Sequence, residues 1–389
     1  MGCKHVRLDD VAVLTPGFAF KSKDFGGYDA KVIKITDVSD DCHVSGLTGV
    51  DLDSYSAANL EKYLVNPGDY FLAMTGSIGK IGRITDGKAY LNQRVLGVRP
   101  SASVNKGYLW QLLNTVEFKN HLLTHIDSHS VQANISAKSV GSFEFTLPDQ
   151  TVQKTIATIL GAFDLKMQIN SALNSYLEEL GKAIWRKAIE TSGTLACIGN
   201  IAAEIVTGKT PSTKVPEYYG DKYPFITIPD MHSNVWLCST ERRLSETGNR
   251  AQPKKLVPRG AVLVSCIATL GLVGIVQKPS HFNQQINAVV PTSEGDEFFL
   301  YYAMRSITQA LLGIGATGSA TLNVNKSAFS QIEIPWLEGK AMAGFVQTVR
   351  PIFETIEANS IESLRLRKLS DSLLPKLMSG EIDVSKVMF

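Results

Sequence analysis

The chain has 389 residues, 44% of them hydrophobic and 20% charged, with a formal net charge of +2 and a pI of about 8.1. This length fits two or three globular domains, and the mildly basic balance permits a nucleic-acid partner without requiring one. The five scattered cysteines exclude a cysteine-based metal site, and "MGCKHVRLDD" excludes a secretory signal, so we expect a cytoplasmic protein with reduced thiols.

Residues 1–147 are the first predicted globular part, rich in strands and punctuated by glycine. Its clearest strand-turn-strand unit is "YLVNPGDYFLAMTGSIGKIGRI", from Tyr63 to Ile84. The "GSIGK" within it resembles a phosphate-binding loop, but that motif requires glycine at Met74 and Ser or Thr at Ile81. We therefore predict a glycine turn between core strands.

Residues 148–190 predict a long helix. Proline is absent from Thr151 to Glu190, and a stripe with 4-3 spacing runs along the segment with a gap at Gly181. At about 1.5 Å per residue this helix would reach about 55 Å, longer than a typical globular helix. The seam positions that we select are Leu160, Phe163, Asn170 and Leu177.

Residues 191–335 repeat the first globular part at an offset of about 190 residues. The segment "KLVPRGAVLVSCIATLGLVGIV" aligns with the strand-turn-strand unit of the first copy. Its apolar stretch is nearly long enough to suggest a membrane span, but the aligned twin carries Asp69, Lys80 and Arg83, which a bilayer core disfavours. Leu272 stands where the first copy has its lysine, so the phosphate-loop reading is excluded for both copies.

Residues 336–389 predict a second long helix, with seam positions Ile352, Ile356, Asn359 and Leu366. Asn170 and Asn359 occupy the same position of the repeat, and an antiparallel pair of helices would bring them together, where a buried amide fixes register. Two alternatives stay open: the asparagines are solvated, or each stripe packs on its own globular part.

The two copies share a scaffold but no catalytic constellation. The sequence contains no G-x-G-x-x-G after a strand, no H-E-x-x-H and no G-x-S-x-G. This pattern favours a binding protein without an enzymatic site, metal or cofactor of its own.

Two long segments carry a family resemblance. "EIVTGKTPSTKVPEYYGDKYPFITIPDM" (Glu204 to Met231) and "LPDQTVQKTIATILGAFDLKMQINSALNSYLEELGKAIW" (Leu147 to Trp185) resemble the specificity subunit of type I restriction-modification systems. The resemblance implies a mixed α/β architecture of two target-recognition domains, 1–147 and 191–335, joined by two antiparallel coiled-coil helices, 148–190 and 336–389, in a pseudo-two-fold repeat.

The resemblance also implies the partners. Each domain would read one half of a split double-stranded DNA site, and the helices would set the gap and dock two modification subunits. S-adenosylmethionine, ATP and Mg²⁺ would belong to partner subunits, including a restriction subunit where one joins. The alternative is a tandem-repeat coiled-coil scaffold that binds proteins without reading DNA.

Candidate DNA contacts are polar side chains in loops that differ between the copies. Asn and Gln bond adenine, Arg bonds guanine, and Lys mainly contacts phosphate. The Asn-Gln pair that occurs in both copies also has a structural interpretation, because a base reader should vary between the halves. The candidates are Lys21, Ser22, Lys23, Asn92, Gln93, Arg94, His129, Gln132 and Asn134 in the first copy, and Lys209, Thr210, Ser212, Lys214, Gln284, Gln285, Thr317, Ser319, Asn323, Asn325 and Lys326 in the second.

Overall fold

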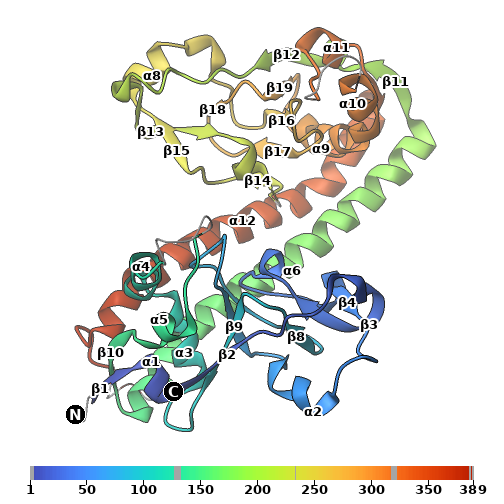
Figure 1. Ribbon diagram of the computed structural model, residues 1–389. Coiled ribbons are helices and arrows are strands. Elements are labelled where there is room, and N and C mark those ends of the chain that lie inside the picture. Colours follow the sequence, from blue (N-terminus) through green and yellow to red (C-terminus); the bar gives the residue numbers. More distant parts are fainter. Residues whose placement is uncertain (1–3, 127–132, 233, 317–321, 385–386, 388–389) are drawn as a thin grey trace. The chain divides into compact units, whose positions relative to one another are not determined.

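The computed structural model describes residues 4–126, 133–232, 234–316, 322–384 and 387. The chain divides into two compact units. Unit 1 comprises residues 1–164 and 368–389, and unit 2 comprises residues 165–367. Each unit therefore contains one globular part together with pieces of both long helices, α6 (Gln150–Ser192) and α12 (Gly339–Met378), which Figure 1 labels.

The globular part of unit 1 is built from three small sheets. Their strand orders are β1-β10, β2-β9-β6-β7 and β4-β3-β8-β5. The strands are β1 (Lys4–Arg7), β2 (Ala12–Pro16), β3 (Phe25–Ile33), β4 (Thr48–Val50), β5 (Leu64–Val65), β6 (Tyr70–Ala73), β7 (Ile81–Arg83), β8 (Ala89–Leu91), β9 (Val95–Pro100) and β10 (Glu144–Leu147), and the short helices are α1 (Leu8–Val11), α2 (Ala57–Leu60), α3 (Lys106–Asn114), α4 (Val116–Thr124) and α5 (Ala137–Gly141).

The globular part of unit 2 repeats this plan with one strand more in one sheet and one strand fewer in another. Its sheets have the orders β11-β20, β12-β19-β16-β17-β14 and β15-β13-β18. The strands are β11 (Thr194–Cys197), β12 (Ala202–Thr207), β13 (Tyr219–Ile226), β14 (Trp236–Leu237), β15 (Arg242–Leu244), β16 (Val262–Ser265), β17 (Val273–Val276), β18 (His281–Phe282), β19 (Ile286–Pro291) and β20 (Glu333–Trp336), and the short helices are α7 (Ile198–Ile201), α8 (Glu246–Arg250), α9 (Asp296–Ser306), α10 (Thr308–Gly315) and α11 (Lys326–Ser330).

The uncharged run from Gly260 to Val276 contains two buried strands, β16 and β17, which pair antiparallel. Val262 and Val264 of β16 face one core cluster, and Leu263 faces another, because successive side chains of a strand point to opposite faces. A strand buried on both faces reads as a continuous apolar run. None of the helices within the described residues is long and apolar enough to cross a membrane.

In unit 2, α6 and α12 run antiparallel along a polar seam. Asn170 Nδ2 donates to Asn359 O at 3.3 Å, and Asn359 Nδ2 donates to Asn174 Oδ1 at 2.8 Å. Asn170 is 1% exposed and also donates to Glu362 at 2.8 Å. Asn170 and Asn359, which occupy the same position of the repeat, thus lie together between the helices. Their side-chain hydrogen bonds fix the register of α6 against α12.

The remaining seam positions pack largely against the globular parts. In unit 1, Leu160 and Phe163 join the same core cluster as Leu373 of α12. In unit 2, Ile352 and Ile356 are buried in the cluster that contains β16, and Leu177 packs against it. Leu366 is half-buried. Both expected environments of the stripe therefore occur, helix against helix in the middle and helix against globular core toward the ends.

The mixed α/β class with an internal repeat, which the sequence predicted, is confirmed. The predicted helical segments were 148–190 and 336–389, and the structure has α6 from Gln150 to Ser192 and α12 from Gly339 to Met378. Gln153, near the start of α6, is 1% exposed and accepts a hydrogen bond from Asn105 N at 2.8 Å, which ties the first turn to the globular part.

Candidate DNA-recognition loops

In unit 1, backbone hydrogen bonds join three loops that lie far apart in sequence. Met74 N donates to Arg94 O at 2.8 Å, and Ile135 N donates to Met74 O at 2.9 Å. Arg94 Nη1 and Thr75 Oγ1 both donate to Asn134 Oδ1, at 3.1 and 2.8 Å. The predicted contacts Arg94 and Asn134 therefore lie side by side.

The same backbone bonds recur in unit 2. Cys266 N donates to Gln285 O at 2.7 Å, and Val324 N donates to Cys266 O at 2.9 Å. Asn323 forms a bridge with Ile267, as Asn134 does with Thr75 in unit 1. The loops that carry the predicted contacts are thus held by one backbone scaffold that occurs in both units.

A fourth loop in each unit begins at a glycine with no room for a side chain. A Cβ on Gly17 would lie 2.0 Å from Asn92 O, and one on Gly208 would lie 2.1 Å from Asn283 O. Gly17 N donates to Val95 O at 2.8 Å, as Gly208 N donates to Ile286 O at 3.1 Å. These glycines bring the loops of 17–23 and 208–214 beside the Asn-Gln segments.

Most predicted contacts are accessible to a ligand. Within the described ranges, the Lys and Arg side chains of this set lie outside ion-pair distance of any carboxylate. His129, Gln132, Thr317 and Ser319 fall outside the described residues. The exposed members are Lys21, Ser22, Lys23, Gln93, Arg94, Lys209, Ser212, Lys214, Gln284, Asn323, Asn325 and Lys326, and the half-buried ones are Asn92, Asn134, Thr210 and Gln285.

Several of these polar side chains also stabilise the loops. Asn283 Oδ1 accepts from Gln285 N at 3.1 Å, and Thr210 Oγ1 donates to Gln284 Oε1. Asn325 Oδ1 accepts from Ala328 N at 2.9 Å and caps α11. The Asn-Gln segments and Asn325 therefore have structural partners within the protein.

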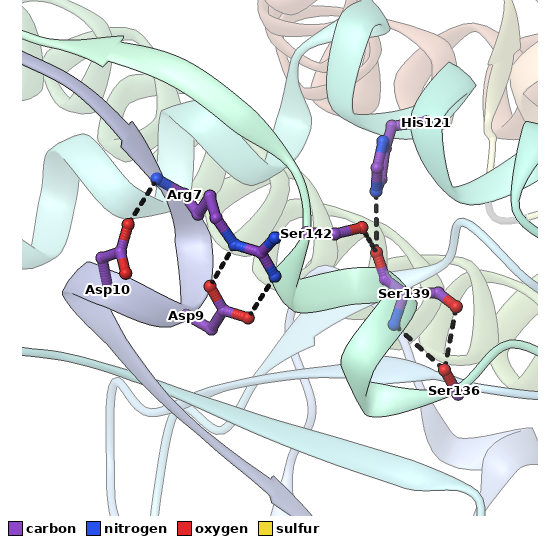
Figure 2. A network of polar contacts seen from close by, with 7 residues as sticks. All are labelled: Arg7, Asp9, Asp10, His121, Ser136, Ser139 and Ser142. Atoms are coloured by element: carbon purple, nitrogen blue, oxygen red, sulfur yellow. Dashed lines mark hydrogen bonds and ion pairs between the residues drawn. The ribbon is translucent and has the colours of Figure 1, made fainter.

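Figure 2 shows how unit 1 supports the segment that follows Asn134. Ser136 Oγ accepts from Ser139 N at 3.0 Å and caps α5, while His121 Nε2 donates to Ser139 O at 2.8 Å. Burial lowers the pKa of His121, which keeps the ring neutral. In the same network Arg7 makes two bonds to Asp9, at 2.9 and 2.8 Å. The loop that contains Asn134 is thus followed by a short helix, α5, which the hydrogen bonds of Ser136 and His121 hold in place.

Sequence reasoning did not identify Thr75, or the hydrogen bonds of Ser136 and His121 to Ser139. Thr75 and Asn134 are separated by 59 residues, so no local pattern marks them as partners. The cap at Ser136 has a local signal, since Ser precedes a short helix. Among the described residues, no three His, Cys, Asp or Glu side chains group to hold a metal ion.

The model of the type I restriction modification DNA specificity domain matches residues 2–179 and 197–363. The chain belongs to this family. The repeat seen in the loops and sheets is therefore the family's own domain occurring twice. The scaffold alternative without DNA readout is not favoured, because the matched domain is one of DNA specificity.

Relatives support this assignment over most of the chain. The HindI specificity subunit of Haemophilus influenzae is 30% identical over 371 residues, which cover 75% of this chain and 81% of that protein. The EcoBI specificity subunit of Escherichia coli is 23% identical, covering 97% of this chain and 86% of that one. The crystal structure of the type I S subunit from M. genitalium has the same fold, with a TM-score of 0.58 at 12% identity, covering 97% of this chain and 96% of that chain.

Proposed function

We propose that each globular part of this specificity subunit reads one half of a bipartite DNA site. The observation that carries the proposal is that one backbone scaffold presents different polar side chains in the two units. Arg94 stands in unit 1 where Gln285 stands in unit 2, and Arg favours guanine whereas Gln favours adenine. The two half-sites are therefore expected to differ in sequence.

The exposed cations supply the sequence-independent part of binding. Lys21 and Lys23 in unit 1 and Lys209, Lys214 and Lys326 in unit 2 are exposed. Lysine contacts to phosphate release counterions, so affinity falls with salt. We expect log K to decrease linearly with log salt, with a slope close to −0.9 for each phosphate contact, and a flat response would contradict DNA binding.

The long helices, 148–190 and 336–389, act in this proposal as spacers between two recognition domains of residues 1–147 and 191–335. The antiparallel amide seam of Asn170, Asn174 and Asn359 in unit 2 supports a fixed register. A fixed register is what a spacer needs, because each base pair advances the DNA helix by about 3.4 Å.

The helix α6 also offers a face for partner subunits. Five large apolar side chains lie 41–76% exposed along it. Their spacing of four, four, three and four residues places them on one face of the helix. An exposed apolar stripe of this kind fits an amphipathic helix of a partner, and we assign it to a modification subunit. The stripe consists of Leu165, Ile169, Leu173, Tyr176 and Leu180.

This docking face can be tested with a matched pair of substitutions. In the repeat Ile169 aligns with Ala358 of α12, which is also exposed. I169E is expected to raise the Kd for the modification subunit at least about tenfold, with A358E as the control of equal charge. Titration calorimetry measures both, and equal affinities for the two variants would show that the stripe is not the docking face.

The chain is proposed to be non-catalytic, with S-adenosylmethionine on the modification subunits and ATP with Mg²⁺ on a restriction subunit. The purified chain is expected to transfer no methyl group and cut no DNA. Together with its modification subunit it is expected to methylate one bipartite sequence. Methyl transfer or DNA cleavage by the isolated chain would overturn the proposal.

A further inference from the structure

One turn of α6 in unit 2 is held by three side chains of α9. Tyr302 Oη donates to Glu178 O at 3.0 Å, and Tyr301 Oη donates to Glu178 Oε1 at 2.9 Å. Arg305 forms an ion pair with Glu178 and donates to Tyr301 Oη at 2.7 Å. The recognition domain of unit 2 therefore contacts both the backbone and the side chain of one helix residue.

This contact requires glycine at position 181. A Cβ on Gly181 would lie 2.2 Å from Tyr302 Oη and 3.1 Å from Tyr302 Cζ, far inside van der Waals contact with the hydroxyl. Tyr301 and Tyr302 are each 2% exposed, and burial raises the pKa of both phenols, so they remain protonated donors. The space left by the missing side chain of Gly181 is thus occupied by the hydroxyl group of Tyr302, and we call this contact the glycine seat.

The glycine seat allows the recognition domain of unit 2 only one position along α6. Moving along α6 by one residue shifts a side chain by about 1.5 Å and turns it by about 100°, which would place Lys182 or Leu180 under Tyr302. Trp185, one turn further along α6, packs against Tyr302 and Phe299 with ring centroids 6.2 and 6.0 Å apart and supports the same register.

The corresponding side chain of unit 1 makes a different contact. Gln111 aligns with Tyr302 in the repeat, and its Nε2 donates to Asp164 of α6 at 3.1 Å. Ser370 of α12 aligns with Gly181. The glycine seat is therefore a feature of unit 2.

We propose that the clamp of Gly181, Tyr302 and Glu178 fixes the position of the second recognition domain on α6 and thereby sets the number of base pairs between the half-sites. This inference rests on the proposed function, in which α6 is a spacer. The three are positioning residues, because they act through the placement of the reading loops.

The test uses the full-length subunit with its modification subunit. Methylome sequencing first defines the site and its spacer of n base pairs. Initial methylation rates are then measured on duplexes with spacers of n−1, n and n+1. The variants are G181A, Y302F and the double variant G181A/Y302F, with G161A as control, because a Cβ on Gly161 in the same helix meets no atom within 4 Å.

The preference of G181A for n over n−1 and n+1 is expected to fall about tenfold, the effect of losing one well-placed buried hydrogen bond. Y302F, which keeps the ring, should lose part of the preference. The double variant should regain part of what G181A loses, because removal of the hydroxyl moves the nearest contact from 2.2 to 3.1 Å. G161A should match the wild type.

Equal loss of rate on all three spacers in G181A and Y302F would show a merely structural role and overturn the inference, as would wild-type ratios in both. If G181A does not fold, the ratio in Y302F decides alone. A wild-type complex that methylates no bipartite site would instead overturn the proposed function itself.

Discussion

The two units hold the helix that follows each globular part by different chemistry. In unit 2, Phe353 of α12 is fully buried and stacks on Phe298 with ring centroids 4.6 Å apart. In unit 1 the aligned position is Asp164, which accepts a hydrogen bond from Gln111. The same difference recurs at Met342 of α12, buried in an apolar cluster, and Gln153 of α6, buried among backbone polar groups.

This difference shows what the repeat preserves. The strand order β2-β9-β6-β7 of unit 1 recurs as β12-β19-β16-β17 in unit 2, and the backbone bonds of the loops occur in both units. The side chains at the helix contact, in contrast, are polar in unit 1 and apolar in unit 2. A duplicated domain therefore keeps its backbone plan while each copy finds its own packing.

The largest effect is expected from F353A in unit 2. Loss of a fully buried phenyl ring leaves a cavity that costs about 3–5 kcal/mol. Guanidinium unfolding followed by Trp fluorescence reports it, since Trp185, Trp236 and Trp336 all lie in unit 2. Y176A, at a 76% exposed site on α6, is the control and should stay within about 0.5 kcal/mol of the wild type. If F353A lowers the free energy of unfolding as little as Y176A does, the contact between Phe353 and Phe298 does not stabilise unit 2.

A smaller effect is expected from Q153A in unit 1. Its carboxamide accepts from Asn105 N at 2.8 Å and donates to Pro148 O at 2.8 Å. Buried groups left without a partner cost about 1–3 kcal/mol. Hydrogen exchange at Asn105 should speed up in Q153A and much less in Q150A, whose side chain is exposed. Unchanged protection at Asn105 in Q153A would mean that this contact does not hold the helix.

The stability of unit 2 should also depend on pH through a buried histidine, His281. Burial lowers the pKa of His281 to about 4, and its ring accepts from Gln252 and donates to Asn249 in the neutral form. The unfolded chain binds a proton near pH 6.5, so stability is full above that pH and is lost as the pH falls toward 4, by about 1–2 kcal/mol at pH 5.

The aligned residue in unit 1 is Tyr90, which carries no imidazole. Thermal unfolding of wild type and H281N between pH 7 and pH 5 measures the effect. The decrease in Tm on acidification should be smaller in H281N. Equal decreases in the two proteins would remove His281 as its cause.

The smallest effect on stability is expected from R94Q, which gives unit 1 the residue of unit 2. Arg94 is exposed, so the free energy of unfolding of R94Q should differ from that of the wild type by less than about 0.5 kcal/mol. The base preference should change in one half-site, because Arg favours guanine whereas Gln favours adenine. Q285R is the reciprocal variant in unit 2. An effect of R94Q on both half-sites would break the link between unit 1 and one half.

The repeat and the fold class were predictable because strands and helices depend on the pattern of apolar residues among near neighbours in the sequence. The buried strands β16 and β17 and the long helix α6 were visible as an apolar run and a 4-3 stripe. The partners of Asn134 and Gly181 were not, since Thr75 and Tyr302 lie 59 and 121 residues away and only the folded chain brings them together. Asn325 was predicted as a DNA contact, and its capping bond to Ala328 needed the helix boundary to be known.

The central claim is that each unit reads its own half-site. Exchanging residues 1–147 for the corresponding domain of another family member, followed by methylome sequencing of cells that carry the chimera and its modification subunit, tests it most directly. The account predicts that one half of the methylated sequence changes while the other half and the spacer stay the same. A change in both halves, or in neither, would contradict it.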